Sequence, residues 1–79
     1  MGTITNANRL VQAAEIAVGD ILPGIDTTRH IVVGVNTGRN LLRGLVVRLT
    51  TAELLPSGRQ SGVTYDTDFS PTERRWVEN

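Results

Sequence analysis

The sequence has no cysteine and no lysine, a single histidine, and only three aromatic residues. Without cysteine the chain forms neither a disulfide nor a thiolate zinc site, and His30 alone does not supply a metal cage. A chain of 79 residues has room for one domain, and such a domain buries only about 60% of its unfolded surface. The missing stability is therefore expected from a closed sheet or from a partner subunit.

No internal repeat, low-complexity tract or linker divides the sequence. Residues 1–79 are therefore predicted to form one small β-barrel domain, with residues 1–8 as a flexible arm. No apolar run approaches the about 20 residues of a membrane span. The N-terminal segment has no basic run and no apolar region followed by a small-residue cleavage site, so it does not resemble a secretory signal. A cytoplasmic location with no membrane partner is expected.

The net charge is zero but unevenly distributed. Residues 1–28 sum to −2, residues 29–59 to +4 and residues 60–79 to −2. All eight cations are arginine, which binds phosphate and carboxylate through paired hydrogen bonds. A GC-rich coding sequence also produces this usage. Segment 29–59 is the candidate basic surface.

Segments 29–36 and 43–51 are rich in β-branched residues and are predicted to be strands. Alternation gives each one wholly apolar face, formed by Ile31, Val33 and Val35 and by Leu45, Val47 and Leu49. Both rows enter one core if odd positions pair with odd, for example Val33 opposite Leu45. Residues 36–40, which include Gly38, are the predicted hairpin loop.

The remaining segments are shorter. Residues 10–18 fit either a helical stripe or a strand, turn and strand, and we favour the second. Residues 60–65 and 74–78 are predicted strands, and the loop between them contains Asp66 and Asp68. Five or six short strands with turns between them predict an all-β fold, a small SH3-like barrel.

A run of motifs carries a resemblance over residues 10–50. It comprises Ala14-Glu15-Ile16, Val18-Gly19-Asp20-Ile21-Leu22 and Arg29-His30-Ile31-Val32-Val33-Gly34-Val35. This order resembles short proteins encoded by actinobacterial phages and their hosts. The resemblance implies an SH3-like small barrel in a bacterial host cell and no assigned activity. In the Gly19-Asp20 pair, glycine permits a strained turn and the Asp20 carboxylate accepts backbone N–H groups across it.

The same run also resembles the central hairpin of intein-type domains. Splicing needs a leading Cys or Ser nucleophile and a terminal His-Asn pair. The sequence has Met1-Gly2 and Glu78-Asn79 at these places, so splicing is not expected.

No catalytic, cofactor or metal residues are predicted. The serines lie in turn-rich sequence without a nucleophile motif, and the glycines form no phosphate loop. Asp66 and Asp68 suggest at most a weak cation site, because the calcium-loop pattern is missing, and a solvated loop is favoured.

Six residues are candidates for binding a partner: Arg39, Arg43, Arg48, Arg59, His30 and Trp76. The arginines offer phosphate contacts, and His30 or Trp76 offers a stacking surface. Trp76 closes the core or anchors an interface, and the core is favoured. Surplus apolar side chains on outer strand faces predict a homo-oligomer, most simply a dimer, through Val32, Val46, Leu41 and Leu42.

Three functions from different classes are predicted from these features. The first is a non-catalytic accessory module of phage type that binds a host or phage protein or assembles with itself. The alternative is a nucleic-acid-binding regulator that uses segment 29–59. A third possibility is an oligomer that sequesters a small anionic ligand with side chains such as Arg48 and Thr50.

Overall fold

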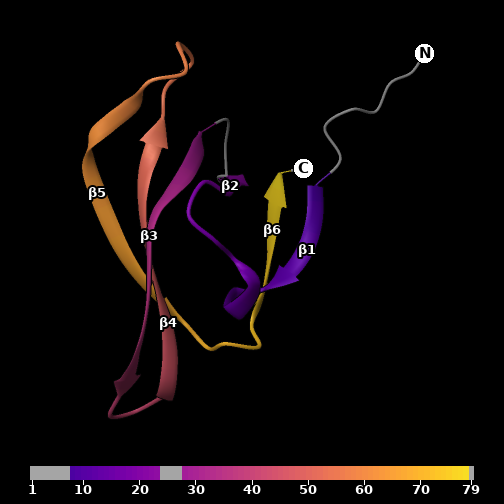
Figure 1. Cartoon of the computed structure of the whole chain (residues 1–79), viewed down its shortest axis with the longest axis vertical. Coiled ribbons are helices and arrows are strands. Elements are labelled where there is room, and N and C mark those ends of the chain that lie inside the picture. The colour runs from indigo at the N-terminus through magenta and orange to yellow at the C-terminus, as the bar shows by residue number, and fades with distance from the viewer. Residues whose placement is uncertain (1–7, 24–27, 79) are drawn as a thin grey trace.

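The computed structural model describes residues 8–23 and 28–78, and β-strands make up most of this part of the chain (Figure 1). The predicted arm at 1–8 lies almost wholly outside the described residues, and Asn8 already belongs to a strand. The described elements are β1 (Asn8–Gln12), one turn of 3-10 helix (Ala13–Glu15), β2 (Ile21–Pro23), β3 (Arg29–Asn40), β4 (Gly44–Leu54), β5 (Gln60–Phe69) and β6 (Arg74–Glu78).

The strands form two antiparallel sheets. β2, β3, β4 and β5 pair in that order, and β1 pairs with β6. Figure 1 shows the β1–β6 ribbon on one side of the molecule and β5 on the other, with β6 running beside β2 without joining its sheet. The predicted all-β fold is confirmed, and the two sheets are not closed into a barrel in the described part of the chain.

Segment 10–18 contains the end of a strand followed by a tight turn, and no α-helix. The Ala13 N–H donates to the Glu73 carbonyl at 2.8 Å, and the Ala14 N–H donates to the Pro71 carbonyl at 3.0 Å. These two amides therefore donate to carbonyls of the β5–β6 connection and not to carbonyls of a longer helix. The strand-and-turn prediction for this segment is confirmed, although the next strand, β2, begins only at Ile21.

The Gly19-Asp20 turn has the structural role predicted for it. Gly19 has a φ of +98°, which favours glycine, and its N–H donates to the Val32 carbonyl at 2.8 Å. The Asp20 carboxylate accepts the Ala17 N–H at 2.9 Å, and the Asp20 carbonyl accepts the Val32 N–H at 2.9 Å. This turn therefore attaches the segment before β2 to Val32 of β3.

A β-bulge at Val33 determines which side chains of β3 face the core. Val32 and Gly34 pair with two consecutive residues of β4, so Val33 is an extra residue. An extra residue shifts the in-and-out alternation by one. Val32 is therefore buried before the bulge, and Val35 packs against the core after it. The predicted continuous row of odd positions in β3 is wrong for this reason.

The predicted pairing of Val33 with Leu45 is also wrong. Leu45 pairs with Arg39, and its side chain is 54% exposed. The cause is the position of the turn. β3 continues through residues 36–40, which were predicted to be the loop, and the turn lies at 41–43.

Asn40 and Gly44 fix this turn. The Asn40 Oδ1 accepts the backbone N–H of Leu42 at 2.8 Å and of Arg43 at 3.2 Å. Asn40 pairs with Gly44, whose φ of +78° lies in the left-handed region. A three-residue loop closed by a glycine of this kind is a common way to join two antiparallel strands.

Gly44→Ala is expected to destabilise the protein by about 1 to 2 kcal/mol, because a Cβ at positive φ crowds the following carbonyl. Gly38→Ala is the matched control, since Gly38 lies in β3 without a positive φ and an added Cβ meets nothing within 4 Å. Urea denaturation of both variants measures the difference. Equal midpoints would show that Gly44 does not set the turn.

The core lies between the four-stranded sheet and the β1–β6 ribbon. Its largest fully buried side chains are Leu49, Val32 and Val77. The buried cluster consists of Ala13, Ile16, Val32, Val47, Leu49 and Val77, with Val11, Leu22, Val35 and Phe69 packed against it. Leu49 and Val47 confirm the odd-numbered face predicted for the middle of β4.

β5 is longer than predicted. Asp66 and Asp68 belong to the strand and pair with Thr50 and Arg48 of β4, so the prediction that they lie in a loop is wrong. The predicted closing strand is confirmed as β6, Arg74–Glu78.

Candidate functional site

The predicted basic residues do not converge on one surface. Arg39 and Arg43 lie beside the β3–β4 turn, whereas Arg59 lies in the β4–β5 connection at the other end of β4. The residues of β4 between them span about 33 Å at the usual rise of a strand. His30 lies near the Arg59 end and pairs with Glu53.

Arg48 is engaged within the chain. Its Nε donates to the Asp68 Oδ1 at 2.7 Å, and its second terminal nitrogen donates to the Oδ2 at 3.1 Å. The hydrogen bond from Arg48 holds the pKa of the Asp68 carboxyl below its ordinary value, and the positive charges of Arg48 and Arg43 act in the same direction. Thr50 donates to the Asp66 carboxylate at 2.6 Å. The side chains proposed for an anionic ligand, Arg48 and Thr50, therefore already bind carboxylates of β5.

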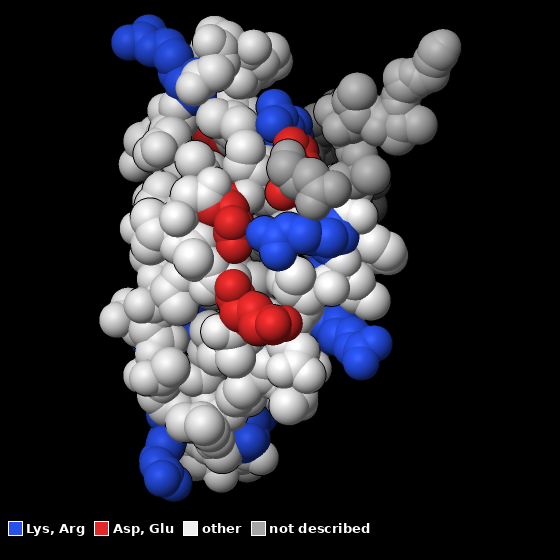
Figure 2. All heavy atoms as spheres, turned by 45° about the vertical axis from the view of Figure 1, so that its right-hand side comes forward, with Lys and Arg blue, Asp and Glu red and all other residues white. Residues whose placement is uncertain are grey.

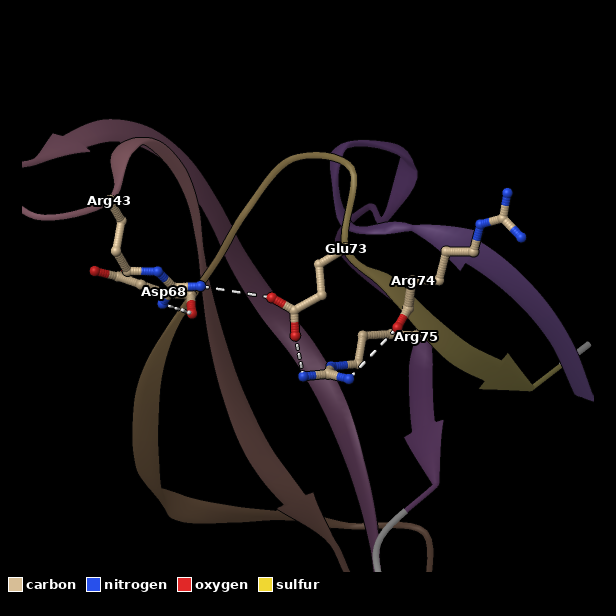
Figure 3. A network of polar contacts seen from close by, with 5 residues as sticks. All are labelled: Arg43, Asp68, Glu73, Arg74 and Arg75. Atoms are coloured by element: carbon tan, nitrogen blue, oxygen red, sulfur yellow. Dashed lines mark hydrogen bonds and ion pairs between the residues drawn. The ribbon is translucent and has the colours of Figure 1, made fainter.

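Arg43 enters a second network (Figure 3). It donates to the Asp68 carbonyl at 3.0 Å and lies 3.5 Å from a carboxylate oxygen of Glu73. Glu73 also pairs with Arg75, whose guanidinium stacks over the Phe69 ring at 4.8 Å from its centroid. Figure 3 shows the Arg74 side chain pointing away from this network. The network connects the hairpin to the β5–β6 turn.

The basic middle of the sequence is thus matched by acidic side chains in the folded chain. Figure 2 shows acidic groups in the middle of one face, with arginines beside them and at both ends of the molecule. Arg39 and Arg59 have no ion pair within the described residues, and they lie at opposite ends of β4. The four arginines predicted to bind phosphate do not form one patch.

Arg29 and Glu78 join the two sheets. The Arg29 guanidinium donates to both Glu78 carboxylate oxygens, each at 2.7 Å. This hydrogen bonding lowers the pKa of the Glu78 carboxyl, and the charge of Arg29 adds to the effect. The pair connects β3 to β6, which share no backbone pairing.

The Arg29–Glu78 pair predicts a loss of stability in acid. Because the folded-state pKa of Glu78 lies below the ordinary 4.5, the pair stabilises the fold above that pH and stops doing so as the pH falls through the folded-state value. We expect Glu78→Gln to lower the Tm by a few degrees at neutral pH and to leave the Tm unchanged at about pH 2. Glu53→Gln is the control. A Tm difference for Glu78→Gln that does not change with pH would contradict the prediction.

The hairpin tip, residues 39–45, carries the most exposed apolar side chains of the described chain. Leu41 and Leu42 are 105% and 96% exposed, and Leu45 beside them is 54% exposed. The backbone beneath them is held by Asn40 and Gly44, so the leucines project from an ordered turn. Sequence reasoning singled out Leu41 and Leu42 but misplaced the turn, and the missed signal is Asn40 followed four residues later by glycine.

Trp76 lies on the outside of the β1–β6 ribbon. It is 54% exposed and pairs with Leu10, which is 44% exposed. The side chain of β6 that enters the core is its neighbour Val77, at 0% exposure. The favoured prediction that Trp76 closes the core is therefore wrong, and Trp76 and Leu10 form a small exposed apolar pair.

The predicted outer face of Val32 and Val46 is also wrong. Both side chains are buried within a single chain, at 1% and 3% exposure. Val32 faces the core because the bulge at Val33 shifts the alternation of β3. Of the four residues predicted for an oligomer interface, only Leu41 and Leu42 are exposed.

The described residues contain no group of three His, Cys, Asp or Glu side chains arranged to hold a metal ion. The two carboxylates considered for a cation, Asp66 and Asp68, face Thr50 and Arg48. Within the same residues, no helix has the length and hydropathy that a membrane crossing requires.

Comparison with known proteins found no matching family model, no similar curated protein and no similar solved structure.

Proposed function

We propose that the protein is a non-catalytic binding module that acts through protein–protein contacts, and that its hairpin tip inserts into a groove of a partner protein. The observation that carries this proposal is the full exposure of Leu41 and Leu42. Paired exposed leucines on a protruding turn expose apolar area that a protein normally covers.

The geometry of the tip favours binding to a preformed groove. Asn40 accepts two backbone hydrogen bonds of the turn, and Gly44 supplies the left-handed residue that closes it. A turn already fixed in this way loses little conformational entropy on binding. Burial of each leucine contributes about 1.5 to 3 kcal/mol.

Charge indicates the chemistry of the partner. Arg39, next to the two leucines, carries no ion pair in the described part of the chain, whereas Arg43 on their other side already contacts Asp68 and Glu73. A groove with an apolar floor and a carboxylate at its rim complements this arrangement. Two tips facing each other would instead bring arginines of the two chains together, so a different protein is the better partner for the tip.

The proposal also covers the fold type of the chain and the kind of organism that it comes from. The chain is an SH3-like small all-β domain of phage type, built from two packed sheets, that acts in the cytoplasm of a bacterial host. The sequence resemblance over residues 10–50 supports this. So does the order of a strand, a tight turn, the Gly19-Asp20 turn and then β2 and β3.

Replacing both leucines tests the proposal. The tagged protein is used to capture partners from host lysate, and wild type is compared with the Leu41→Ser/Leu42→Ser double variant and with Val18→Ser. Val18 is 64% exposed and lies outside the hairpin, so it controls for loss of a surface apolar side chain.

We expect one partner to be retained by wild type and Val18→Ser and to fall by about tenfold or more with the double variant. Circular dichroism should show all three proteins equally folded, since the replaced side chains are exposed. Equal retention by the double variant, or no partner above background with wild type, would overturn the proposal.

A further inference from the structure

The outer face of the β1–β6 ribbon holds an exposed aromatic side chain. Residues paired across antiparallel strands lie on the same face, and the faces alternate along each strand. Val77 lies in the core, so Trp76 and its partner Leu10 lie on the opposite face. Trp76 is 54% exposed and Leu10 is 44% exposed. Figure 1 shows this ribbon apart from the hairpin tip, so the two surfaces are separate.

The exposure of Trp76 is not what stability alone would favour. Tryptophan has a larger apolar surface than valine, so burying Trp76 would stabilise the fold more than burying Val77. The structure nevertheless buries the valine and exposes the tryptophan. The backbone of Trp76 is held by its pairing with β1, so the ring is presented from an ordered strand. A large apolar side chain presented in this way is typical of a binding surface.

Polar side chains lie beside Trp76 on the same face. Arg74 is two residues away on the same strand, about 7 Å at the usual rise. Its guanidinium has no ion pair within the described residues, and Figure 3 shows it pointing away from the network of Glu73. Gln12 pairs with Arg74 across the ribbon, and its amide both donates and accepts hydrogen bonds.

The negative charge on this face is already matched. Glu78 lies two residues beyond Trp76 and pairs with Asn8. Both carboxylate oxygens of Glu78 accept hydrogen bonds from Arg29. The face therefore presents an aromatic ring, an amide at each end and the unmatched positive charge of Arg74.

We propose that this face binds single-stranded nucleic acid, with one unpaired base stacked on Trp76 and a neighbouring phosphate bound by Arg74. Aromatic side chains that stack on bases, combined with cations along the backbone, are the general means of binding single strands. A guanidinium binds a phosphate through paired hydrogen bonds, and the Gln12 amide can bond to the edge of a base. The site does not depend on the function proposed for the hairpin tip.

Charge and size favour this ligand over two others. A neutral sugar also stacks on tryptophan, but it would leave Arg74 without a partner of opposite charge. A specific protein interface buries about 800 Å² on each partner, which is much more than two apolar side chains on a narrow ribbon provide. A base inside a duplex is already stacked and paired, so the base must be unpaired.

Trp76 is the single tryptophan of the chain, so its fluorescence reports directly on the proposed contact. An oligothymidylate of about ten nucleotides is titrated into the purified protein, with excitation selective for tryptophan. We expect the emission to fall with a Kd of about 1 to 100 µM at physiological salt. The same oligonucleotide in a duplex, and maltohexaose as a neutral sugar, should leave the emission unchanged.

Substitutions on the ribbon test the stacking, with binding measured by the anisotropy of an end-labelled oligothymidylate. We expect Trp76→Leu to weaken binding by about 5- to 150-fold, because it removes one stacked base, whereas Trp76→Phe should retain most of the affinity. Circular dichroism should show both variants folded, since the side chain is exposed. Leu41→Ser/Leu42→Ser should bind the oligonucleotide as wild type does.

A salt titration tests the phosphate contact. Arg74→Gln should reduce the slope of log K against log salt by about 0.7, the value for one phosphate of a single strand. Arg59→Gln is the matched control, because Arg59 also has no ion pair within the described residues and lies outside the ribbon. Its slope should equal that of wild type.

Unchanged Trp76 emission with the single strand, or equal affinity of Trp76→Leu and wild type, would overturn the proposal. Quenching by maltohexaose in place of the oligonucleotide would identify a sugar site and would also overturn it. Equal slopes for Arg74→Gln and Arg59→Gln would overturn the phosphate contact. None of these measurements involves a partner protein, so failure here is distinguishable from failure of the function proposed for the hairpin tip.

Discussion

Val32→Asp is expected to unfold the protein, whereas Leu45→Asp is expected to leave it folded. Val32 is 1% exposed and lies in the core cluster, so the aspartate would be a buried charge without a partner. Leu45 is 54% exposed and pairs with Arg39, so an aspartate there reaches solvent and gains an opposite charge across the strand pair. The contrast follows from the bulge and the position of the turn.

Circular dichroism and thermal melting of the two variants measure this contrast. We expect no cooperative transition for Val32→Asp and a Tm close to that of wild type for Leu45→Asp. If the odd-numbered faces predicted by strict alternation formed the core, Leu45→Asp would be the unfolded variant. That result, or equal Tm values, would contradict the observed register.

Leu49→Ala is the second substitution that we expect to cause a large loss of stability. Leu49 is the largest of the fully buried side chains, and truncating such a leucine costs about 2 to 5 kcal/mol. The whole stability of a domain of 79 residues is about 4 to 12 kcal/mol, so this loss leaves the variant close to unfolding. A small core has few other side chains that can compensate.

Leu45→Ala is the matched control for Leu49→Ala, since it removes the same atoms from the same strand at an exposed position. We expect it to cost less than about 1 kcal/mol. Urea denaturation gives both values. A loss for Leu49→Ala no larger than that for Leu45→Ala would show that the core does not lie on this face of β4.

The sequence predicted most of the strands but not the bulge that sets their faces. β-branched residues mark 29–36 and 43–51, and strands cover both except for Arg43. Alternation then placed Val33 inside, because a pattern of period two contains no sign of an extra residue. The bulge depends on Val32 and Gly34 pairing with consecutive residues of β4, which is a property of two strands together.

The candidate binding surfaces could also be predicted only in part from the sequence. Exposed leucines at 41 and 42 were recognisable, because they interrupt turn-forming sequence. The ion pairs of Arg48 and Arg43 were not recognisable, because their partners come from β5 and the β5–β6 turn, 20 to 30 positions further along the chain. Such pairs depend on register, which composition does not contain. Trp76 was misplaced because hydrophobicity alone favours burial of the largest side chain.

Site-specific photocrosslinking tests the role of the hairpin tip most directly. A photoreactive phenylalanine derivative replaces Leu42 in one variant and Val18 in another, and both are irradiated in host cells. We predict one discrete adduct from position 42, with an added mass different from the 8.6 kDa of a second copy, and no such adduct from position 18. The same products from both positions, no adduct from position 42, or an adduct with a second copy alone would contradict it.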